Sequence, residues 1–518
     1  MASSEPASRP GARELVLLGS VFGVALAGLV YELVAGTLST YLLGASVTVF
    51  SLVIGWFLFA MGLGAWLAQY VSDRDEARAF VVAEIAVAAV GGSSALLLFA
   101  AFAWLGEGYL VVLALVTLVV GALVGVEIPL ILRILKAQVD IRIAVSQVLA
   151  LDYIGALAGS IAFPLILLPW LGAVRSAALL GLLNIGVSWM AMAVLRASIP
   201  NWRAWLGLSG VVGSGLLGVL LTGANTTRWL EDQLYQDDVI LALDTPYQRM
   251  VVTRWRDDIR LYLNGHLQFS TIDEYRYHEA LVLPALASTV PGRVLILGGG
   301  DGLAVRRILD YPGVQHVDLV DLDPAVTEVF TQNTMMAALS GGALSDPRVT
   351  VHHMDAVKFL ESAEGRYDLI VMDLPDPNDA DLARLYAVST YRLALRRLDE
   401  RGALVTQATS PFYAPEAFWC IIATLEVAAS ESRVSRVVHP AHVQVPSFGE
   451  WGFALLTAAD VQVDSLPIPA KTRFLDTDAL RAMWRFPVDM ARLDVEPNRL
   501  GEAAVSRYYR RGWTHYRQ

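Results

Sequence analysis

The chain has 518 residues, of which 55% are hydrophobic and 17% are charged, and its mean hydropathy is +0.50. This composition is too apolar for a protein that is soluble throughout, and the net charge of −11 argues against a nucleic-acid partner while it suits a cationic substrate. The single cysteine, Cys420, excludes an intrachain disulfide and a thiolate metal cluster, so we expect no metal site.

The apolar excess lies in residues 13–223, after a short polar tail at 1–12. The first apolar segment has no small-residue cleavage site, so we interpret it as a membrane helix and not as a removed signal peptide. We therefore predict an α-helical bundle that crosses the cell membrane several times, with the lipid bilayer as a partner. Seven segments are long enough to span a bilayer, namely 14–36, 46–70, 79–103, 108–132, 145–170, 173–195 and 205–223.

Four acidic residues, Glu32, Glu84, Glu127 and Asp152, lie within these predicted spans or near their ends. Acidic groups inside a bilayer are costly and often functional, so one interpretation is a path for polyamines or protons. The other interpretation, which we favour at this stage, is that these acids pair within the bundle or lie close to an interface.

A polar linker at 224–237 follows, which we expect to form a short interfacial helix. Residues 238–290 alternate in the manner of β-strands, and Asn264-Gly265 is a strong hairpin signal. From 291 to 518, strands alternate with helices, which predicts a parallel α/β sheet of the Rossmann-like methyltransferase type with a C-terminal helical tail. We expect its strands at 293–298, 316–321, 348–352, 367–373, 402–407 and 434–439.

Residues 294–302 read VLILGGGDG, an apolar strand that breaks into a glycine turn before a helix. In Rossmann-like sheets, such a turn presents backbone N–H groups to a nucleotide-bearing ligand, so Gly298, Gly299 and Gly300 are candidate donor-binding residues. Asp301 places a carboxylate inside this turn. We therefore expect the nearby part of the ligand to carry a positive charge.

The later strands also end in acids. Asp321 follows the glycine loop by about 20 positions, where such folds hold ribose hydroxyls, although it could instead cap the helix that begins near Pro324. Asp355 could accept a hydrogen bond from an adenine amino group, could cap the next helix, or could do both. Asp373 and Asp376 follow a buried strand and suit a rigid loop that pairs with amines.

Together these motifs resemble the spermidine synthase family, the polyamine aminopropyltransferases, over roughly residues 238–500. Two departures bear on the amine site: DLPDP at 373–377 lacks the small hydroxyl residues that family members often have between the acids, and Phe448 replaces a tyrosine. The motifs that carry the resemblance are TPYQR (245–249), LNGHLQFSTIDEYRYHE (263–279), LILGGGDG (295–302), VDLDP (320–324) and YDLIVMDLPDP (367–377).

The resemblance implies a role for each donor-site residue. Gln248 and Asp321 would hold the ribose, and Asp355 would hold the adenine. Asp301 would bind the aminopropyl ammonium of decarboxylated S-adenosylmethionine, and Gln268 would line that site. The same Asp301 would repel the carboxylate of ordinary S-adenosylmethionine, which is selection by rejection as well as attraction.

On the amine side, the resemblance implies that Tyr277 and Asp373 handle the attacking amine and that Asp376 orients it, with His278 adjacent. An ammonium has no lone pair, so a general base must remove its proton, and Asp373 is the candidate.

We therefore expect an enzyme that transfers an aminopropyl group from decarboxylated S-adenosylmethionine, as co-substrate, to a diamine such as putrescine, releasing methylthioadenosine without a prosthetic group. Putrescine, cadaverine, agmatine and longer amines all remain open as acceptors. The alternatives are a small-molecule methyltransferase that uses S-adenosylmethionine, and a polyamine transporter or sensor whose soluble half only binds. Soluble relatives commonly form dimers or tetramers, so a homo-oligomer is also expected.

Two indicators of topology disagree. By the positive-inside rule the basic loops face the cytoplasm, and seven spans would then place the C-terminal domain outside. Decarboxylated S-adenosylmethionine is made in the cytosol, as the family's chemistry implies, so we expect a cytoplasmic catalytic domain; a span count wrong by one, a re-entrant segment or an outward-facing domain are the alternatives. The basic loops carry Arg74, Arg78, Arg133, Lys136, Arg142, Arg196 and Arg203.

We expect the aromatic, arginine-rich tail at 506–518 to form a solvated helix, with contact to a partner subunit or to lipid as the alternative.

Overall fold

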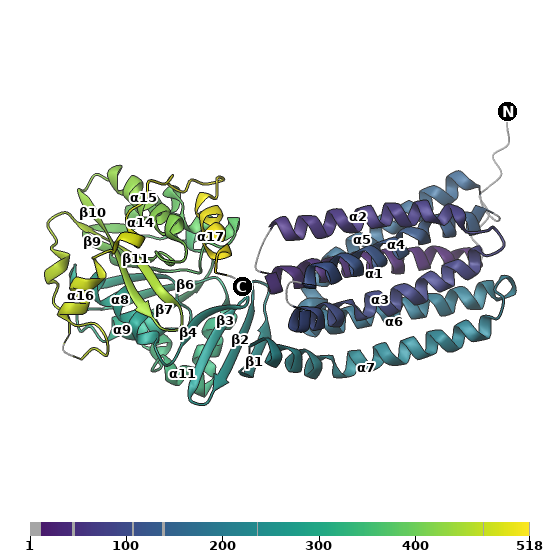
Figure 1. Cartoon of the computed structure of the whole chain (residues 1–518), viewed down its shortest axis with the longest axis horizontal. Coiled ribbons are helices and arrows are strands. Elements are labelled where there is room, and N and C mark those ends of the chain that lie inside the picture. Colours follow the sequence, from purple (N-terminus) through teal and green to yellow (C-terminus); the bar gives the residue numbers. More distant parts are fainter. Residues whose placement is uncertain are drawn as a thin grey trace. The chain divides into compact units, whose positions relative to one another are not determined.

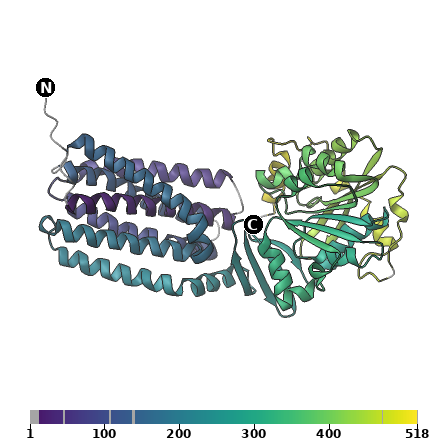
Figure 2. The same cartoon turned by 180° about the vertical axis from the view of Figure 1, so that it is seen from behind.

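The computed structural model of the chain describes residues 12–43, 47–105, 108–136, 140–235, 237–469 and 471–516. Contacts between residues divide the chain into two compact units, Met1–Pro246 and Tyr247–Gln518. Figures 1 and 2 show a helical unit and a mixed α/β unit from two opposite sides. Each unit is described by itself below.

The helical unit consists of long apolar helices followed by a strand, β1 (Asp238–Asp244). Among the described residues, six helices are long and apolar enough to cross a membrane, judged by length and composition only. One of these six runs from Ile141 to Ser198 and joins two helices through a π-helical turn at Phe163–Leu167. Gly172 interrupts it with a non-helical φ of 71°. The helices are α1 (Ala12–Leu43), α2 (Val47–Leu67), α3 (Glu76–Leu105), α4 (Tyr109–Lys136), α5 (Ile141–Ala162), α6 (Leu168–Leu195) and α7 (Trp202–Tyr235).

Helix α7 corrects one expectation from the sequence. Residues 224–235 do not form a separate linker helix, because α7 continues without a break through Tyr235. The physical reason is that this stretch contains neither proline nor glycine and includes good helix formers such as Leu230, Glu231 and Gln233.

Close packing between α2 and α4 depends on glycine. A Cβ atom on Gly64 would lie 1.9 Å from the carbonyl oxygen of Ala122, and one on Gly125 would lie 2.1 Å from the carbonyl oxygen of Met61. Small residues allow helix backbones to approach in this way in apolar surroundings. The two helices therefore touch backbone to backbone.

The α/β unit begins with strands β2 (Arg249–Trp255), β3 (Asp258–Leu263) and β4 (His266–Ser270), which pair in antiparallel fashion. The predicted hairpin turn is confirmed: Asn264 and Gly265 separate β3 from β4, and both have positive φ, 49° and 79°. Helix α8 (Glu274–Ala287) lies within the range expected for the strand subdomain, yet it packs against the strands of the larger sheet.

The larger sheet has seven strands in the order β10-β11-β9-β8-β5-β6-β7. The strands from β9 to β7 are parallel, as predicted, but β11 runs antiparallel to both β9 and β10. The expectation of an all-parallel sheet is therefore wrong at this edge, because the short turn at 446–448 joins β10 and β11 as a hairpin. The bounds are β5 (Arg293–Gly298), β6 (His316–Asp321), β7 (Val349–His353), β8 (Tyr367–Asp373), β9 (Leu398–Gln407), β10 (Arg436–Val445) and β11 (Gly449–Ala458).

Helices cover both faces of this sheet (Figure 1). On one face, a buried apolar cluster joins the strands to α12 (Ala356–Ser362), α14 (Val388–Arg397), α15 (Pro415–Ser430) and α17 (Ala504–Thr514). On the other face, α8 packs beside α9 (Leu303–Leu309). The chain order changes direction between β5 and β8, so their carboxyl ends form the topological switch point where ligands bind in such folds.

The backbone contact between α2 and α4 gives a test. We expect Gly64→Ala to lower the free energy of unfolding by about 1–3 kcal/mol, because its methyl group would overlap the Ala122 carbonyl. The matched control is Gly62→Ala in the same helix, where a Cβ would meet no heavy atom within 4 Å. Thermal unfolding of the detergent-solubilised chain measures both variants, and an equal melting temperature for the two would contradict the contact.

Candidate active site

The glycine loop after β5 is held in a conformation that side chains would disrupt. Gly298 has a φ of 82°, and a Cβ on it would lie 2.0 Å from the carbonyl oxygen of Asp373 on the neighbouring strand. A Cβ on Gly300 would lie 2.5 Å from the Oδ2 atom of Asp321. Instead, the Gly300 N–H donates a hydrogen bond of 3.0 Å to that same Oδ2 atom. Because its residues have no side chains, the glycine loop can lie directly against the ends of β8 and β6.

Asp301 lies at the start of α9, where its Oδ1 atom accepts a hydrogen bond of 2.8 Å from the Leu303 N–H. Burial raises the pKa of this carboxyl group to about 6. The nearby charge of His278 acts in the opposite direction, whereas the carboxylate of Asp373 raises the pKa further. Asp301 is thus a carboxylate that would be stabilised by a second cation.

His278 lies near both Asp301 and Asp373, and it is 3% exposed. Its Nδ1 atom lies 2.9 Å from the Oε2 atom of Glu274, whose Oε1 atom accepts a hydrogen bond of 2.7 Å from Arg306. Burial alone would lower the pKa of His278, but the hydrogen bond to Glu274 and the surrounding carboxylates raise it. Both acceptors of Nδ1 are oxygens of Glu274, so this nitrogen carries a proton.

Asp321, Asp323 and Gln248 form a chain of contacts. Asp321 accepts a second hydrogen bond, of 2.9 Å, from the Asp323 N–H, and burial raises the pKa of its carboxyl group. Gln248 donates a hydrogen bond of 3.0 Å to the Oδ2 atom of Asp323, and not to Asp321. Asp323 also caps α10 (Pro324–Gln332). The residue that caps this helix is therefore Asp323, and not Asp321 as the alternative interpretation suggested.

Asp355 caps the helix that follows it, α12, as the second interpretation of this residue predicted. Its Oδ1 atom accepts hydrogen bonds from the N–H groups of Val357 and Lys358 at the start of α12, and its other oxygen pairs with Arg384. Burial would raise the pKa of this carboxyl group, but the hydrogen bonds from Arg384 hold it below its ordinary value. An adenine amino group would share this carboxylate with those donors.

Gln268 donates its hydrogen bond of 3.0 Å to the carbonyl oxygen of His266. The structure thus places the Gln268 amide against its own strand, and no contact described joins it to Asp301. Its role on the donor side stays a prediction.

Tyr277 and Asp373 are brought together as the sequence suggested. The Tyr277 hydroxyl donates a hydrogen bond of 2.6 Å to the Oδ1 atom of Asp373 at the end of β8. Burial raises the pKa of both groups. Tyr277 therefore acts as the hydrogen-bond donor of this pair, and the Asp373 carboxylate is more basic than usual.

Asp376 is held by two residues that the sequence analysis did not single out. Its Oδ2 atom accepts a hydrogen bond of 2.9 Å from the Tyr509 hydroxyl, and its Oδ1 atom accepts one of 3.3 Å from the Gln407 amide. Burial raises the pKa of the Asp376 carboxyl group to about 6, although both hydrogen bonds lower it. Tyr509 belongs to α17 and is 4% exposed, so the C-terminal tail packs on the site and is not simply a solvated helix.

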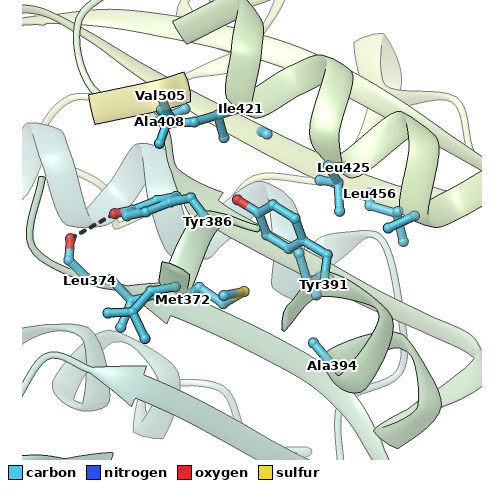
Figure 3. Close-up of a cluster of buried hydrophobic side chains, with 14 of the residues drawn as sticks. Met372, Leu374, Tyr386, Tyr391, Ala394, Ala408, Ile421, Leu425, Leu456 and Val505 are labelled. Carbon is cyan, nitrogen blue, oxygen red and sulfur yellow. Dashed lines mark hydrogen bonds between the residues drawn. The ribbon is translucent and has the colours of Figure 1, made fainter. Parts of the chain in front are cut away.

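Gln407 and Tyr386 brace the loop that carries Asp376. The Tyr386 hydroxyl donates to the carbonyl oxygens of Leu374, at 3.2 Å, and Pro375, at 2.9 Å. Figure 3 shows the first of these bonds and the apolar side chains around Tyr386, which include Val505 of α17. Gln407 donates a hydrogen bond of 2.8 Å to the same Leu374 carbonyl. This bracing gives the DLPDP loop its rigidity without hydroxyl residues between the acids.

Phe448 lies beside Tyr277, with ring centroids 6.0 Å apart, and Phe453 flanks the same ring at 5.3 Å. The turn that carries Phe448 is anchored by Asp273, which accepts hydrogen bonds from the backbone N–H and the hydroxyl of Ser447, at 2.6 and 2.8 Å. Phe448 and Phe453 thus place apolar rings beside Tyr277.

The fold and these residues define a class: a Rossmann-like protein with half-buried carboxylates at its switch point. Residues 274–465 match the family model described as the spermine/spermidine synthase domain. Polyamine aminopropyltransferase 1 of Ralstonia nicotianae is 47% identical over 521 residues, which covers 99% of this chain and 97% of that relative. The polyamine aminopropyltransferase of Leptospira interrogans is 43% identical and covers 95% of this chain and 98% of its own length. The chain therefore belongs to the polyamine aminopropyltransferase family.

Among solved structures, the crystal structure of a spermidine synthase in complex with the transition-state analogue AdoDATO has a TM-score of 0.44 and 20% sequence identity. It covers 48% of this chain and 85% of its own. A spermidine synthase from Thermotoga maritima has a TM-score of 0.43 and 19% identity, over 48% of this chain and 84% of its own.

Proposed function

We propose that this chain transfers the aminopropyl group of decarboxylated S-adenosylmethionine to a diamine and releases methylthioadenosine. Family membership supports this reaction. The observation that carries the proposal is that three carboxyl groups with raised pKa, those of Asp301, Asp373 and Asp376, surround the switch point. Like charges buried together are stabilised by cations, and both substrates of this reaction are cationic.

On the donor side, Asp301 pairs with the ammonium of the aminopropyl arm, while the glycine loop and Asp321 hold the nucleoside. Asp355 contributes to the adenine side as a carboxylate already fixed by Arg384. His278, kept protonated by Glu274, balances part of the negative charge between Asp301 and Asp373. This positive charge opposes the rise in the pKa of both carboxyl groups.

On the amine side, Asp373 accepts a proton from the attacking ammonium, and Tyr277 orients Asp373 through its hydrogen bond. The freed nitrogen forms a bond to the aminopropyl carbon as the bond from that carbon to sulfur breaks. The sulfonium thereby becomes neutral methylthioadenosine, and the proton resides on Asp373. Alignment of nitrogen, carbon and sulfur provides the remaining rate enhancement.

The distal ammonium of the diamine pairs with Asp376. The Tyr509 hydroxyl fixes one oxygen of that carboxylate, and Phe448 offers an apolar wall beside Tyr277. An apolar wall beside Tyr277 suits the methylene chain of a diamine. Tyr509 is therefore a positioning residue for the acceptor.

We also propose that the helical unit crosses the membrane seven times. Six helices have suitable length and composition, and the helix at Ile141–Ser198 has 58 residues. At 1.5 Å per residue it would be roughly 87 Å long, about three times the hydrocarbon thickness of a bilayer, so it cannot be one crossing. The interruption at Gly172 divides it into two.

The reaction is tested with the purified full-length chain and a panel of diamines, read by mass spectrometry. We expect methylthioadenosine and an aminopropylated amine from the decarboxylated donor. Asp373→Asn should reduce kcat by about 10²–10⁴-fold, because it removes the general base.

Asp301→Asn should weaken the preference for the decarboxylated donor. Formation of S-adenosylhomocysteine from S-adenosylmethionine would indicate a methyltransferase, and unchanged donor selectivity would remove the argument for Asp301.

The role of Tyr509 predicts a shift in pH dependence. An Asp carboxyl group whose pKa is about 6 is protonated below that pH and loses its attraction for an ammonium, so kcat/KM for the diamine should fall as pH decreases through about 6. Tyr509→Phe removes a hydrogen bond that lowers the pKa of Asp376, so the fall should begin at a higher pH. Tyr508→Phe, one residue earlier in α17, is the control. Identical profiles for the two variants would refute the role of Tyr509.

The side of the membrane is tested by protease accessibility. We propose a cytoplasmic catalytic domain because the donor is made in the cytosol, although the basic loops predict the opposite side. In right-side-out vesicles, residues 247–518 should resist added protease and become digested after permeabilisation. Digestion in sealed vesicles would show that the domain faces outward.

A further inference from the structure

A second group of polar side chains lies inside the helical unit, between two apolar clusters. One cluster joins the first halves of α1 and α3 to the last halves of α4 and α6. The other joins the opposite halves of the same four helices. Glu84 of α3 and Glu127 of α4 fall between the clusters, and both are 0% exposed. They lie 8 and 9 residues from Glu76 and Lys136, the helix ends nearest to them, or about 12–14 Å deep.

The fold does not satisfy these groups. Among the residues that the structure describes, all four carboxylate oxygens of Glu84 and Glu127 lack a hydrogen-bond partner. The same is true of the Tyr31 hydroxyl and of both side-chain polar atoms of Asn184, and these residues are 2% and 0% exposed. A buried polar atom without a partner loses the hydrogen bonds that water would give it, and the loss is greater if the atom is charged. We call Tyr31, Glu84, Glu127 and Asn184 the buried polar layer.

The layer is formed by four helices that contact one another. Helix α1 packs against α3, because a Cβ on Gly91 would lie 2.7 Å from the Tyr31 ring, and against α4, because a Cβ on Gly28 would lie 3.0 Å from Val124. Helices α3 and α6 run in opposite directions, since the first half of α3 clusters with the second half of α6. A Cβ on Gly181 would lie 3.0 Å from the carbonyl oxygen of Ala88. Glu84 precedes Ala88 by one turn of α3, and Asn184 follows Gly181 by about one turn of α6. Because the two helices are antiparallel, Glu84 and Asn184 lie at about the same level of the bundle.

The chemistry of the layer fits an organic ammonium. An ammonium group donates three hydrogen bonds and carries the charge that two carboxylates require. The apolar clusters on either side match the methylene chain of an amine. No group of three His, Cys, Asp or Glu side chains in the described part of the chain is placed to hold a metal ion. We propose that the buried polar layer is a second amine-binding site, which binds an ammonium group of a diamine or polyamine independently of the catalytic unit.

Counting the amine sites of the full-length chain tests this proposal. Equilibrium dialysis with radiolabelled putrescine, on the chain in lipid nanodiscs, should find two sites per wild-type molecule. The double variant Glu84→Gln/Glu127→Gln should retain one site and unchanged aminopropyl transfer, whereas Asp376→Asn should lose the other site. Tyr31→Phe, a milder change, should weaken the second site by about tenfold. Glu14→Gln, which removes a charge near the start of α1, is the matched control and should retain both sites.

Three results would overturn the proposal. The first is a single site in the wild-type chain, and the second is two sites in the Glu84→Gln/Glu127→Gln variant. The third is a carboxylic-acid C=O stretching band in amine-free protein that the double variant lacks and that putrescine does not change. That band would show that the glutamates are neutralised by protons and not by an amine. If aminopropyl transfer itself is absent, the putrescine count still decides the second site.

Discussion

The site depends on keeping several half-buried carboxylates close together at the ends of two neighbouring strands. Asp301, Asp373 and Asp376 come from two loops, and the parallel pairing of β5 with β8 sets their separation. The backbone of Gly298 lies against that of Asp373 so closely that no side chain fits between them. Mutual repulsion would drive these acids apart or protonate them, and the protein opposes it with a protonated imidazole and with donors from Tyr277, Tyr509 and Gln407. The carboxylates are thus kept ready for substrates that bring the missing positive charge.

Much of this arrangement follows from short-range sequence signals. The glycine loop, the hairpin at Asn264-Gly265 and the strands at 293–298, 316–321 and 367–373 were predicted with the observed bounds, because turn chemistry and buried strands leave local patterns. The pairing of Tyr277 with Asp373 also agrees with the family resemblance. Their roles in catalysis stay predictions.

The remaining features depend on contacts between distant parts of the chain, and no local pattern encodes them. Tyr509 meets Asp376 across 133 positions, and Arg384 meets Asp355 across 29. Strand β11 was not among the predicted strands, so the antiparallel edge of the sheet was missed with it. A partial signal did exist for Tyr509: Val505 and Tyr509 are spaced four apart, which places an apolar stripe on the tail helix. Gln407 stands at the end of its strand as the acids do, so the rule that ligands bind at strand ends could have included it.

Strand β10 has a consequence for how copies of this chain could associate. It is the outer strand of the seven-stranded sheet, and Pro440 lies in its middle, opposite Ala454. A proline there has no N–H to offer to an incoming strand, so this edge resists the strand-to-strand addition through which exposed sheets aggregate. Any oligomer of the catalytic unit that extends the sheet at β10 would lose a hydrogen bond at its centre. Association through helical surfaces carries no such penalty.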